Sequence, residues 1–395
     1  MISDKTKTRD RNRYAILREI QKQGPLRRTE LSRRCGIRIS SVVSVVEELV
    51  EKRFLKLADP EHPRAAVAYA GREWFVLAAS VAPQEITFGR VDVAGQVDHS
   101  FCVALSPESS PDDLVNTLCD GLGSLHAMQP DRTLGIGIAL TGIVTRAGGI
   151  WHSAIHFPAV HDMPLMEAVT RRMGMPVLLE NDARASLWAA VWFDPRLTHC
   201  RHAIYLSLCG GVGSALMIDG RPHPGAHQWA GELGHMRAGS EGRPCSCGKA
   251  NCIETYCSLP ALRTDILRAE PGLSPLPDAA AVAEAIRRNP VAANIAERAM
   301  ERLGTLLGTL AAYVDPDVIL LGNQDPQLYE ALLPSLRLHL QRQFQGRGAM
   351  NLPIEIVPDA IHAPLCGMTG LVLNEVFQAS LSSFNDHGSP FTLAH

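Results

Sequence analysis

Hydrophobic positions near the start of the chain repeat with the spacing of short amphipathic helices. The pattern predicts helices over residues 13–23, 29–34 and 39–52. A Gly-Pro pair ends the first helix, and Gly36 supplies a tight turn before the third. The third helix is expected to bury one aliphatic stripe: Val42, Val45, Val46 and Leu49.

From Trp74 onward the pattern changes to strands that alternate with helices. Strands are predicted over residues 75–81, 86–92, 96–105, 134–140 and 177–179, with helices over residues 111–128 and 164–173. A second pair of strands, over residues 203–208 and 215–220, repeats the first pair. Two such halves predict a two-lobed α/β body with a cleft between the lobes.

The order of helix, helix, glycine turn and helix is typical of a helix-turn-helix, in which the start of the last helix enters the major groove of DNA. Residues 54–57 and 67–69 are expected to pair as a wing. The candidate DNA-binding residues are Arg28, Arg38, Ser40, Ser41, Ser44 and Arg64. Serines are weaker base readers than Arg, Asn or Gln, so Arg38 and Arg64 are expected to carry much of the affinity.

Charge is distributed unevenly along the chain. Residues 1–56 hold 15 Lys and Arg against 7 Asp and Glu, a net +8, whereas the whole chain is at −3 and the remainder is therefore at −11. A basic head on an acidic body favours a polyanion-binding module. Three-helix modules also serve as protein-interaction domains, and the charge favours DNA over that alternative.

Length and composition bound the class of protein. A chain of 395 residues is expected to form two or three domains, and 46% apolar with 20% charged residues is ordinary soluble composition. No apolar run approaches the roughly 20 residues that span a bilayer. The charged start lacks a signal-peptide core, and ten cysteines then indicate reduced thiols. We expect a cytoplasmic protein without membrane contact.

One imidazole and three thiols fall within a short segment rich in Gly and Pro: His235, Cys245, Cys247 and Cys252. Zinc favours four-coordinate Cys₃His sites, and such a loop can fold these ligands onto one ion. The alternative is a set of buried free thiols beside an unrelated His, and the C-x-C then C-x₄-C spacing favours structural Zn²⁺. The carboxylates of Glu232 and Glu254 flank the cluster.

Asn181 and Asp182 come directly after a predicted buried strand. Polar groups at such strand ends line the clefts of open α/β sheets. The same pair could cap a helix that starts at Ala183, and the two interpretations are compatible.

Several segments together resemble the signature of the ROK family (repressors, open reading frames and kinases): residues 180–182, 231–235, 245–248, 252–254, 315–322 and 366–370. The resemblance implies an actin/hexokinase-like two-lobed body preceded by a winged helix-turn-helix. It also implies that five residues hydrogen-bond sugar hydroxyls, with the His also ligating zinc: Asn181, Asp182, Glu232, His235 and Glu254.

In ROK kinases the residue that matches Asp182 acts as the base, and two glycine-rich turns hold ATP. The first turn begins with an Asp followed by a Gly, where this chain has Ser80 and Ala82. Pro83 then removes a backbone donor, and the second turn, residues 209–213, lacks the usual Thr. We therefore expect no kinase activity. The chain also departs from the family pattern at Arg184, at Trp188 and over residues 156–160. These departures leave the identity of the sugar open.

The leading hypothesis is a sugar-responsive transcriptional regulator, expected to repress genes of carbohydrate metabolism or transport. Its expected partners are double-stranded operator DNA, a sugar or sugar-phosphate effector in the cleft, and further copies in a homodimer or homotetramer. The alternatives are an active ROK sugar kinase with an appended DNA-binding domain, and a scaffold with neither activity. The expected domains are residues 1–70 (winged helix-turn-helix), 71–187 with the helix 365–380 (lobe 1), 188–364 (lobe 2 with zinc) and a disordered tail, 381–395.

Overall fold

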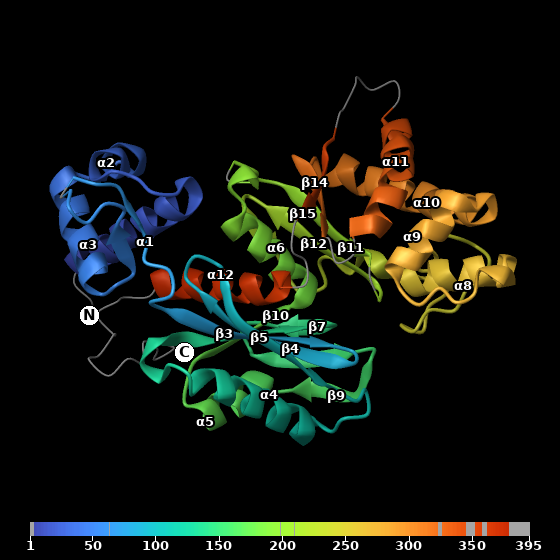
Figure 1. Ribbon diagram of the computed structural model, residues 1–395, viewed down its shortest axis with the longest axis horizontal. Coiled ribbons are helices and arrows are strands. Elements are labelled where there is room, and N and C mark those ends of the chain that lie inside the picture. The colour runs from blue at the N-terminus through green and yellow to red at the C-terminus, as the bar shows by residue number, and fades with distance from the viewer. Residues whose placement is uncertain are drawn as a thin grey trace. The chain divides into compact units, whose positions relative to one another are not determined.

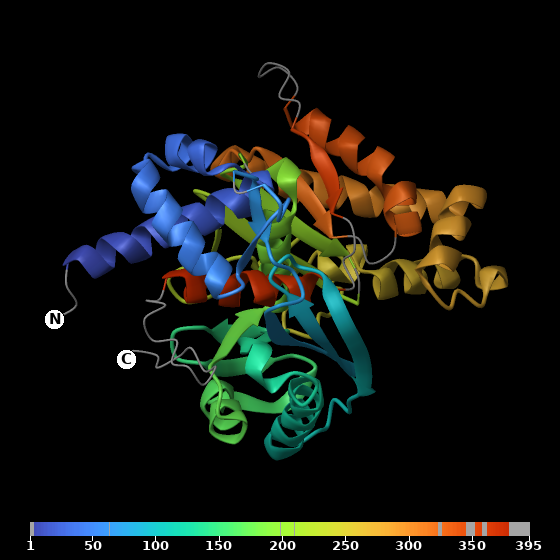
Figure 2. The ribbon, with the colours of Figure 1, turned by 60° about the vertical axis from the view of Figure 1, so that its left-hand side comes forward.

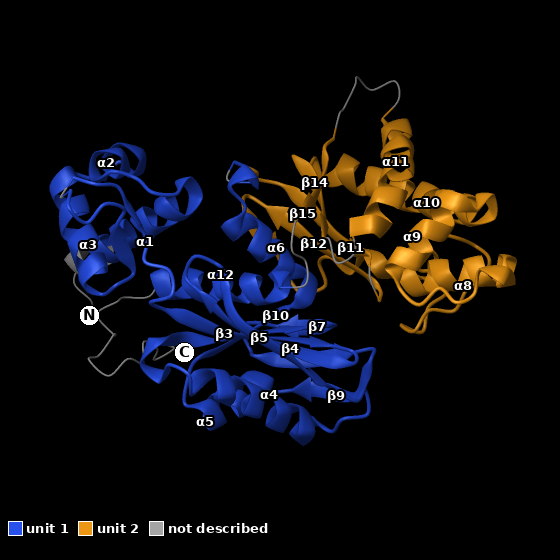
Figure 3. Cartoon of the chain, in the orientation of Figure 1, with its two compact units in different colours: residues 1–199, 362–395 blue, residues 200–361 orange. Residues whose placement is uncertain are grey.

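The computed structural model describes residues 4–62, 64–197, 199–208, 210–322, 326–344, 352–357 and 362–378. The chain separates into two compact units, unit 1 (residues 1–199 and 362–395) and unit 2 (residues 200–361) (Figure 3). The expected boundary after residue 187 falls inside a helix of unit 1 that ends at Phe193. The predicted disordered tail lies outside the described residues.

Unit 1 begins with a small head of three helices and a hairpin (Figure 1). Its elements are α1 (Asp4–Gln23), α2 (Arg28–Cys35), α3 (Ile39–Glu51), β1 (Leu55–Leu57) and β2 (Val67–Tyr69). Gly36 caps α2 with a φ of 65°, in the left-handed region that favours glycine. The aliphatic stripe of α3 is buried, and β1 and β2 pair antiparallel. The predicted winged helix-turn-helix is therefore present, although α1 begins at Asp4 and not at residue 13.

Ion pairs join the N-terminal half of α1 to α3. The carboxylate of Glu48 on α3 accepts from Arg9 at 2.8 Å and from the buried Arg13 at 2.7 Å. Arg13 also pairs with Asp10 at 2.6 Å. Partial burial disfavours the charge of Glu48, but hydrogen bonds and the charges of both Arg residues hold its pKa below the usual value. Sequence periodicity could not show these pairs because the start of α1 carries no apolar stripe.

The larger part of unit 1 is a five-stranded sheet between helices. Its strand order is β10-β6-β3-β4-β5, with β3, β6 and β10 parallel and β4 and β5 antiparallel. The strands are β3 (Phe75–Ala82), β4 (Glu85–Asp92), β5 (Val97–Ala104), β6 (Thr133–Leu140) and β10 (Val177–Asn181). The helices are α4 (Pro111–His126), α5 (Leu165–Met173), α6 (Asp182–Phe193) and α12 (Ala363–Gln378), with 3₁₀ turns η1 (Pro130–Arg132) and η2 (Pro195–Leu197).

Alternation along the central strand β3 sorts its side chains between two cores. Val76 and Ala78 join the core on the side of α6 and α12, whereas Leu77 and Ala79 join the core under α4 and α5. Figure 2 shows α12 on one face of the sheet and α4 and α5 on the other. A small additional sheet of β7 (Ile143–Thr145), β8 (Ile150–Ala154) and β9 (Phe157–Met163) was not predicted.

The head and the sheet of unit 1 share one continuous core. Phe377 of α12 stacks on Tyr69 of β2 at 6.2 Å between ring centroids, and contacts Phe54 edge-on at 6.3 Å. The guanidinium of Arg18 on α1 lies 4.0 Å above the ring of Trp192 on α6. These contacts fix the head to α6 and α12 within unit 1.

Unit 2 holds a second five-stranded sheet, of order β13-β12-β11-β14-β15. Its strands are β11 (Ala203–Leu208), β12 (Val212–Ile218), β13 (Arg221–His223), β14 (Val318–Gly322) and β15 (Ile354–Val357). Its helices are α7 (Glu254–Cys257), α8 (Leu259–Ala269), α9 (Ala279–Arg288), α10 (Pro290–Val314) and α11 (Pro326–Gln343), with turns η3 (Glu232–His235) and η4 (Pro271–Leu273). Among the described residues, no helix has an apolar stretch long enough to cross a bilayer.

Candidate functional site

Four potential metal ligands gather in unit 2 between η3 and α7. They are His235, Cys245, Cys247 and Cys252, and their ligand atoms all lie within 4.8 Å of one another. The Sγ atoms of Cys247 and Cys252 are 3.6 Å apart, as are Cys245 Sγ and His235 Nδ1. Thiolates 2.3 Å from a tetrahedral ion would be about 3.8 Å apart, so this donor set could hold a metal ion such as zinc.

Backbone pairing of the surrounding loop brings the thiols together. Cys245 N donates to Lys249 O at 2.9 Å, and Ile253 N donates to Met236 O at 2.8 Å, which joins both ends of the loop. Burial raises the pKa of Cys252 to about 12. Burial also opposes ionisation of Cys247, but the Lys249 backbone N–H and the neighbouring thiols hold its pKa below the usual value.

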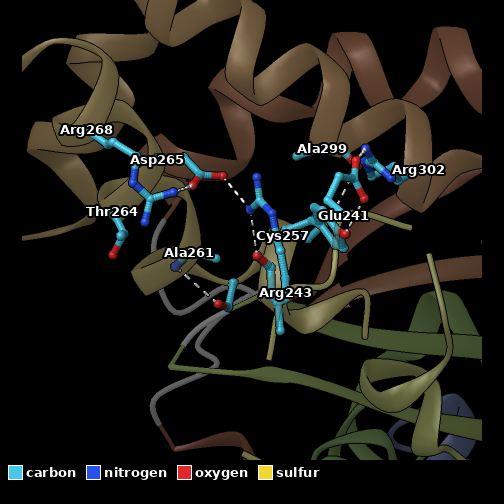
Figure 4. A network of polar contacts seen from close by, with 12 residues as sticks. Glu241, Arg243, Cys257, Ala261, Thr264, Asp265, Arg268, Ala299 and Arg302 are labelled. Carbon is cyan, nitrogen blue, oxygen red and sulfur yellow. Dashed lines mark hydrogen bonds and ion pairs between the residues drawn. The ribbon is translucent and has the colours of Figure 1, made fainter. Parts of the chain in front are cut away.

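A polar network joins the loop to α7, α8 and α10 of unit 2 (Figure 4). The guanidinium groups of Arg243 and Arg302 each lie over the ring of Tyr256, 4.3 Å from its centroid. Arg243 donates to Asp265 at 2.6 Å, and Arg302 pairs with Glu241. The Tyr256 hydroxyl donates to Glu241 at 2.6 Å and is the main reason that the pKa of Glu241 falls to about 2. Sequence reasoning missed this network because its members are dispersed along the chain.

Two carboxylates predicted to bind sugar lie next to the cluster. Glu232 Oε2 is 4.0 Å from His235 Nε2, and Glu254 Oε1 is 3.9 Å from Cys245 Sγ. Glu254 Oε2 also accepts from Val212 N at 3.1 Å. At Gly234 a Cβ would lie 2.2 Å from Val212 O, so close approach of η3 to β12 requires glycine there.

The other two predicted sugar residues lie in unit 1, where β10 meets α6. The Asn181 side chain accepts from Arg184 N at 3.1 Å and donates to Gly142 O at 3.1 Å. It is therefore the N-cap of α6, as the alternative interpretation predicted. Asp182 opens the first turn of α6 and is partly exposed.

A buried ion pair beneath this turn was not predicted. Arg184 donates through Nε to Glu180 Oε1 at 2.7 Å, and the two side chains are only 3% and 5% exposed. Glu180 ends β10 and Arg184 lies in the first turn of α6, so no helical spacing indicated the pair, and only burial shows that it points inward. Trp188, the other departure on α6, is buried and contacts Trp192 at 6.1 Å.

The segment that matches the first kinase phosphate turn is a tight hairpin. Ser80 of β3 pairs with Thr87 of β4, and Ala82 pairs with Glu85, so Pro83 and Gln84 form the turn. The matching second turn joins β11 to β12, and Cys209 within it lies outside the described residues.

The predicted DNA-contacting side chains lie at three places in the head. Arg38 precedes α3, and four candidates are on helices: Arg28 at the start of α2, and Ser40, Ser41 and Ser44 on α3. Arg38, Ser40 and Ser44 are exposed, and Arg28 and Ser41 are partly exposed. Arg64 is exposed in the connection between the wing strands.

Known proteins with similar sequences and folds match nearly the whole chain. The DNA-binding transcriptional repressor Mlc of Escherichia coli (strain K12) is 24% identical over 386 residues, which cover 94% of both chains. A crystal structure of a ROK family transcriptional regulator, a homolog of E. coli MLC, aligns over 94% of this chain and 100% of its own, with a TM-score of 0.77 and 21% identity. A ROK hexokinase from Thermus thermophilus aligns over 77% of this chain and 100% of its own, with a TM-score of 0.63 and 25% identity.

A winged helix-turn-helix, a hexokinase-like α/β body and a Cys₃His cluster together define a class of two-part proteins related to sugar kinases. The chain belongs to the ROK family, whose model matches residues 83–375. The family resemblance and the fold class predicted from the sequence are therefore confirmed.

Proposed function

We propose that the protein is a sugar-responsive transcriptional regulator that represses genes of carbohydrate metabolism or transport. It would act in the cytoplasm as a homodimer or homotetramer. The observation that carries this proposal is that similarity to the Mlc repressor extends over 94% of both chains, whereas similarity to the hexokinase covers 77% of this one.

DNA binding is assigned to the head. The start of α3 presents Arg38, Ser40 and Ser44 to solvent, and Arg64 lies on the wing. The net charge of +8 over residues 1–56 favours a phosphate backbone. Two heads in a dimer would contact two half-sites of an operator.

Sugar binding is assigned to Asn181 and Asp182 of unit 1 and to Glu232, His235 and Glu254 of unit 2. Sugar hydroxyls donate and accept hydrogen bonds, so carboxylates and an amide can satisfy them in pairs. A sugar that binds one arrangement of the two units better than another would change the population of DNA-binding states.

A structural Zn²⁺ is assigned to His235, Cys245, Cys247 and Cys252. The ion would hold the loop that carries Glu232 and Glu254, and it would orient the His235 ring beside Glu232. The 3.6 Å separation of two of the donor pairs, close to the spacing of ligands on one tetrahedral ion, supports this assignment.

The test combines DNA selection with ligand screening of the full-length protein. The DNA fragments that it selects from a random pool define the probe. A panel of hexoses, pentoses, N-acetylhexosamines and their phosphates is then screened by thermal shift, because a ligand of the native state raises its stability. We expect one sugar to raise the melting temperature and to change the affinity for the selected DNA. Failure of the protein to select any DNA would refute the proposed function.

The second candidate is an ATP-dependent sugar kinase, favoured by the alignment with the whole length of the ROK hexokinase. Against it, Ser80 and Ala82 stand where the family's first phosphate turn has Asp and Gly. With ATP, Mg²⁺ and the same sugars, we expect ADP formation no faster than in a reaction without protein. The kinase would be favoured if the wild type forms ADP in a sugar-dependent reaction and a Ser80→Asp variant forms it no faster.

A further inference from the structure

The turn that joins β10 to α6 is fixed by a closed network of hydrogen bonds around one buried carboxylate. Glu180 Oε1 accepts from the backbone N–H of Asn181 at 2.9 Å and from Arg184 Nε at 2.7 Å. Asn181 in turn caps α6 through the N–H of Arg184. The carboxylate of Glu180 therefore holds both the backbone before Asp182 and the side chain of Arg184.

The same network reaches the connection between β6 and β7. Asn181 Nδ2 donates to Gly142 O at 3.1 Å, and Arg184 Nη2 lies 3.5 Å from Val144 O. A Cβ at Gly142 would lie 2.2 Å from Ser153 O, so this connection is itself tightly packed. The turn is thus tied to the connection between β6 and β7 through Gly142 and to β7 itself through Val144.

Burying the ion pair costs desolvation free energy, because two charged side chains that are 3% and 5% exposed have lost most of their hydration. An apolar pair of the same volume would pack α6 against the sheet without that penalty. Such a pair would leave Asn181 N without its acceptor and would not reach Val144 O. Compared with an apolar pair, the ion pair therefore contributes hydrogen bonds that fix the conformation of the turn.

We propose that Arg184 and Glu180 are positioning residues for the effector: their ion pair fixes the orientation of Asn181 and Asp182. This inference rests on the proposed binding of a sugar by those two residues. Neither Glu180 nor Arg184 touches the sugar in this proposal. They act by limiting the conformations of the turn before the sugar arrives, which reduces the entropy lost on binding.

The test compares three full-length variants with the wild type. Glu180→Met/Arg184→Met removes both charges and keeps side-chain volume, so no unpaired charge is left in the core. Arg184→Lys keeps the charge and loses the planar guanidinium. The control, Arg90→Met/Asp98→Asn, removes a pair between β4 and β5 in which Arg90 Nε donates at 2.9 Å and the side chains are 13% and 21% exposed.

Two readouts are taken from each variant: the Kd for the sugar that shifts the wild type, and amide hydrogen exchange of the peptide covering residues 177–184. We expect the Met/Met variant to bind the sugar at least about tenfold more weakly, since small misplacements of binding groups have effects of this size. Its Asn181 and Arg184 amides should exchange faster, Arg184→Lys should be intermediate, and the control should match the wild type in both readouts.

An unchanged Kd together with unchanged exchange in the Met/Met variant would overturn the inference. A lower melting temperature with both readouts unchanged would also overturn it, because it would show a structural role only. If no sugar in the panel binds the wild type, sugar binding by the proposed residues fails, and amide exchange alone decides whether the pair fixes the turn.

Discussion

Replacing Phe377 with Ala should loosen the head from the rest of unit 1. Phe377 is fully buried at the point where α12 meets the head, and it contacts three aromatic rings, those of Phe54, Tyr69 and Trp192. Truncation of a buried Phe costs about 3–5 kcal/mol, because burial is lost and a cavity remains. Two of the ring pairs have favourable stacked or edge-on geometry, which places the expected loss near the upper end of that range.

The matched control is Phe157→Ala, which truncates another fully buried Phe in the core on the opposite face of the sheet. Phe157 contacts Trp151 edge-on at 5.5 Å, so the loss of stability should be similar. Urea unfolding of both variants measures the free energy. Limited proteolysis around residues 70–74 measures the release of the head, because this segment joins the head to β3.

We expect both variants to be destabilised and only Phe377→Ala to be cleaved faster at the connecting segment under native conditions. In Phe377→Ala the sugar should also change the affinity for DNA by a smaller factor than it does in the wild type. Equal cleavage of the two variants would refute the reasoning, since it would mean that the shared core does not hold the head.

Three further predictions concern the metal, the DNA and acid stability. Cys247→Ser should reduce bound zinc, measured by mass spectrometry, and lower the melting temperature, whereas Cys257→Ser, at a buried thiol outside the cluster, should keep one zinc per chain. Arg38→Ala should lower the slope of log K against log[salt] for DNA binding by about 1, whereas the exposed Arg171→Ala should leave it unchanged. Because the folded-state pKa of Glu48 is lowered, its contribution is complete above the unfolded value of about 4.3 and is lost as the pH falls through the folded pKa. Glu48→Gln should therefore flatten the fall in stability measured by urea unfolding between neutral and acidic pH; an equally steep fall would contradict this.

Much of the fold could be predicted from local patterns. The stripe of α3 and the glycine at position 36 predicted the helix-turn-helix, and the strand pattern that begins after Trp74 predicted β3, β4 and β5. The sheet of β7, β8 and β9 was missed because β7 is only three residues long and the strands are joined by sharp turns. The start of α1 was missed because it has no apolar stripe and packs against α3 through ion pairs.

The candidate site, too, has a part that could be predicted from the sequence and a part that could not. The ligand spacing in the Cys₃His loop could be read from the sequence because all four side chains fall on one short segment. Arg184 could only be seen as a departure from the family, since its inward direction and its bond to Glu180 depend on tertiary burial. Tyr256 gave no signal either, because Arg302 reaches it from a distant helix.

The core shared by the head and α12 also determines which pieces of the chain can be exchanged with relatives. A head transplanted alone onto another ROK body would lose its contacts with Phe377 of α12 and with Trp192, which lies under Arg18. The smallest exchangeable piece is therefore discontinuous: it joins the first 74 residues to the C-terminal helix and to the end of α6. Recombination at the connecting segment alone would produce a chimera whose head is attached by the backbone but lacks its packing surface.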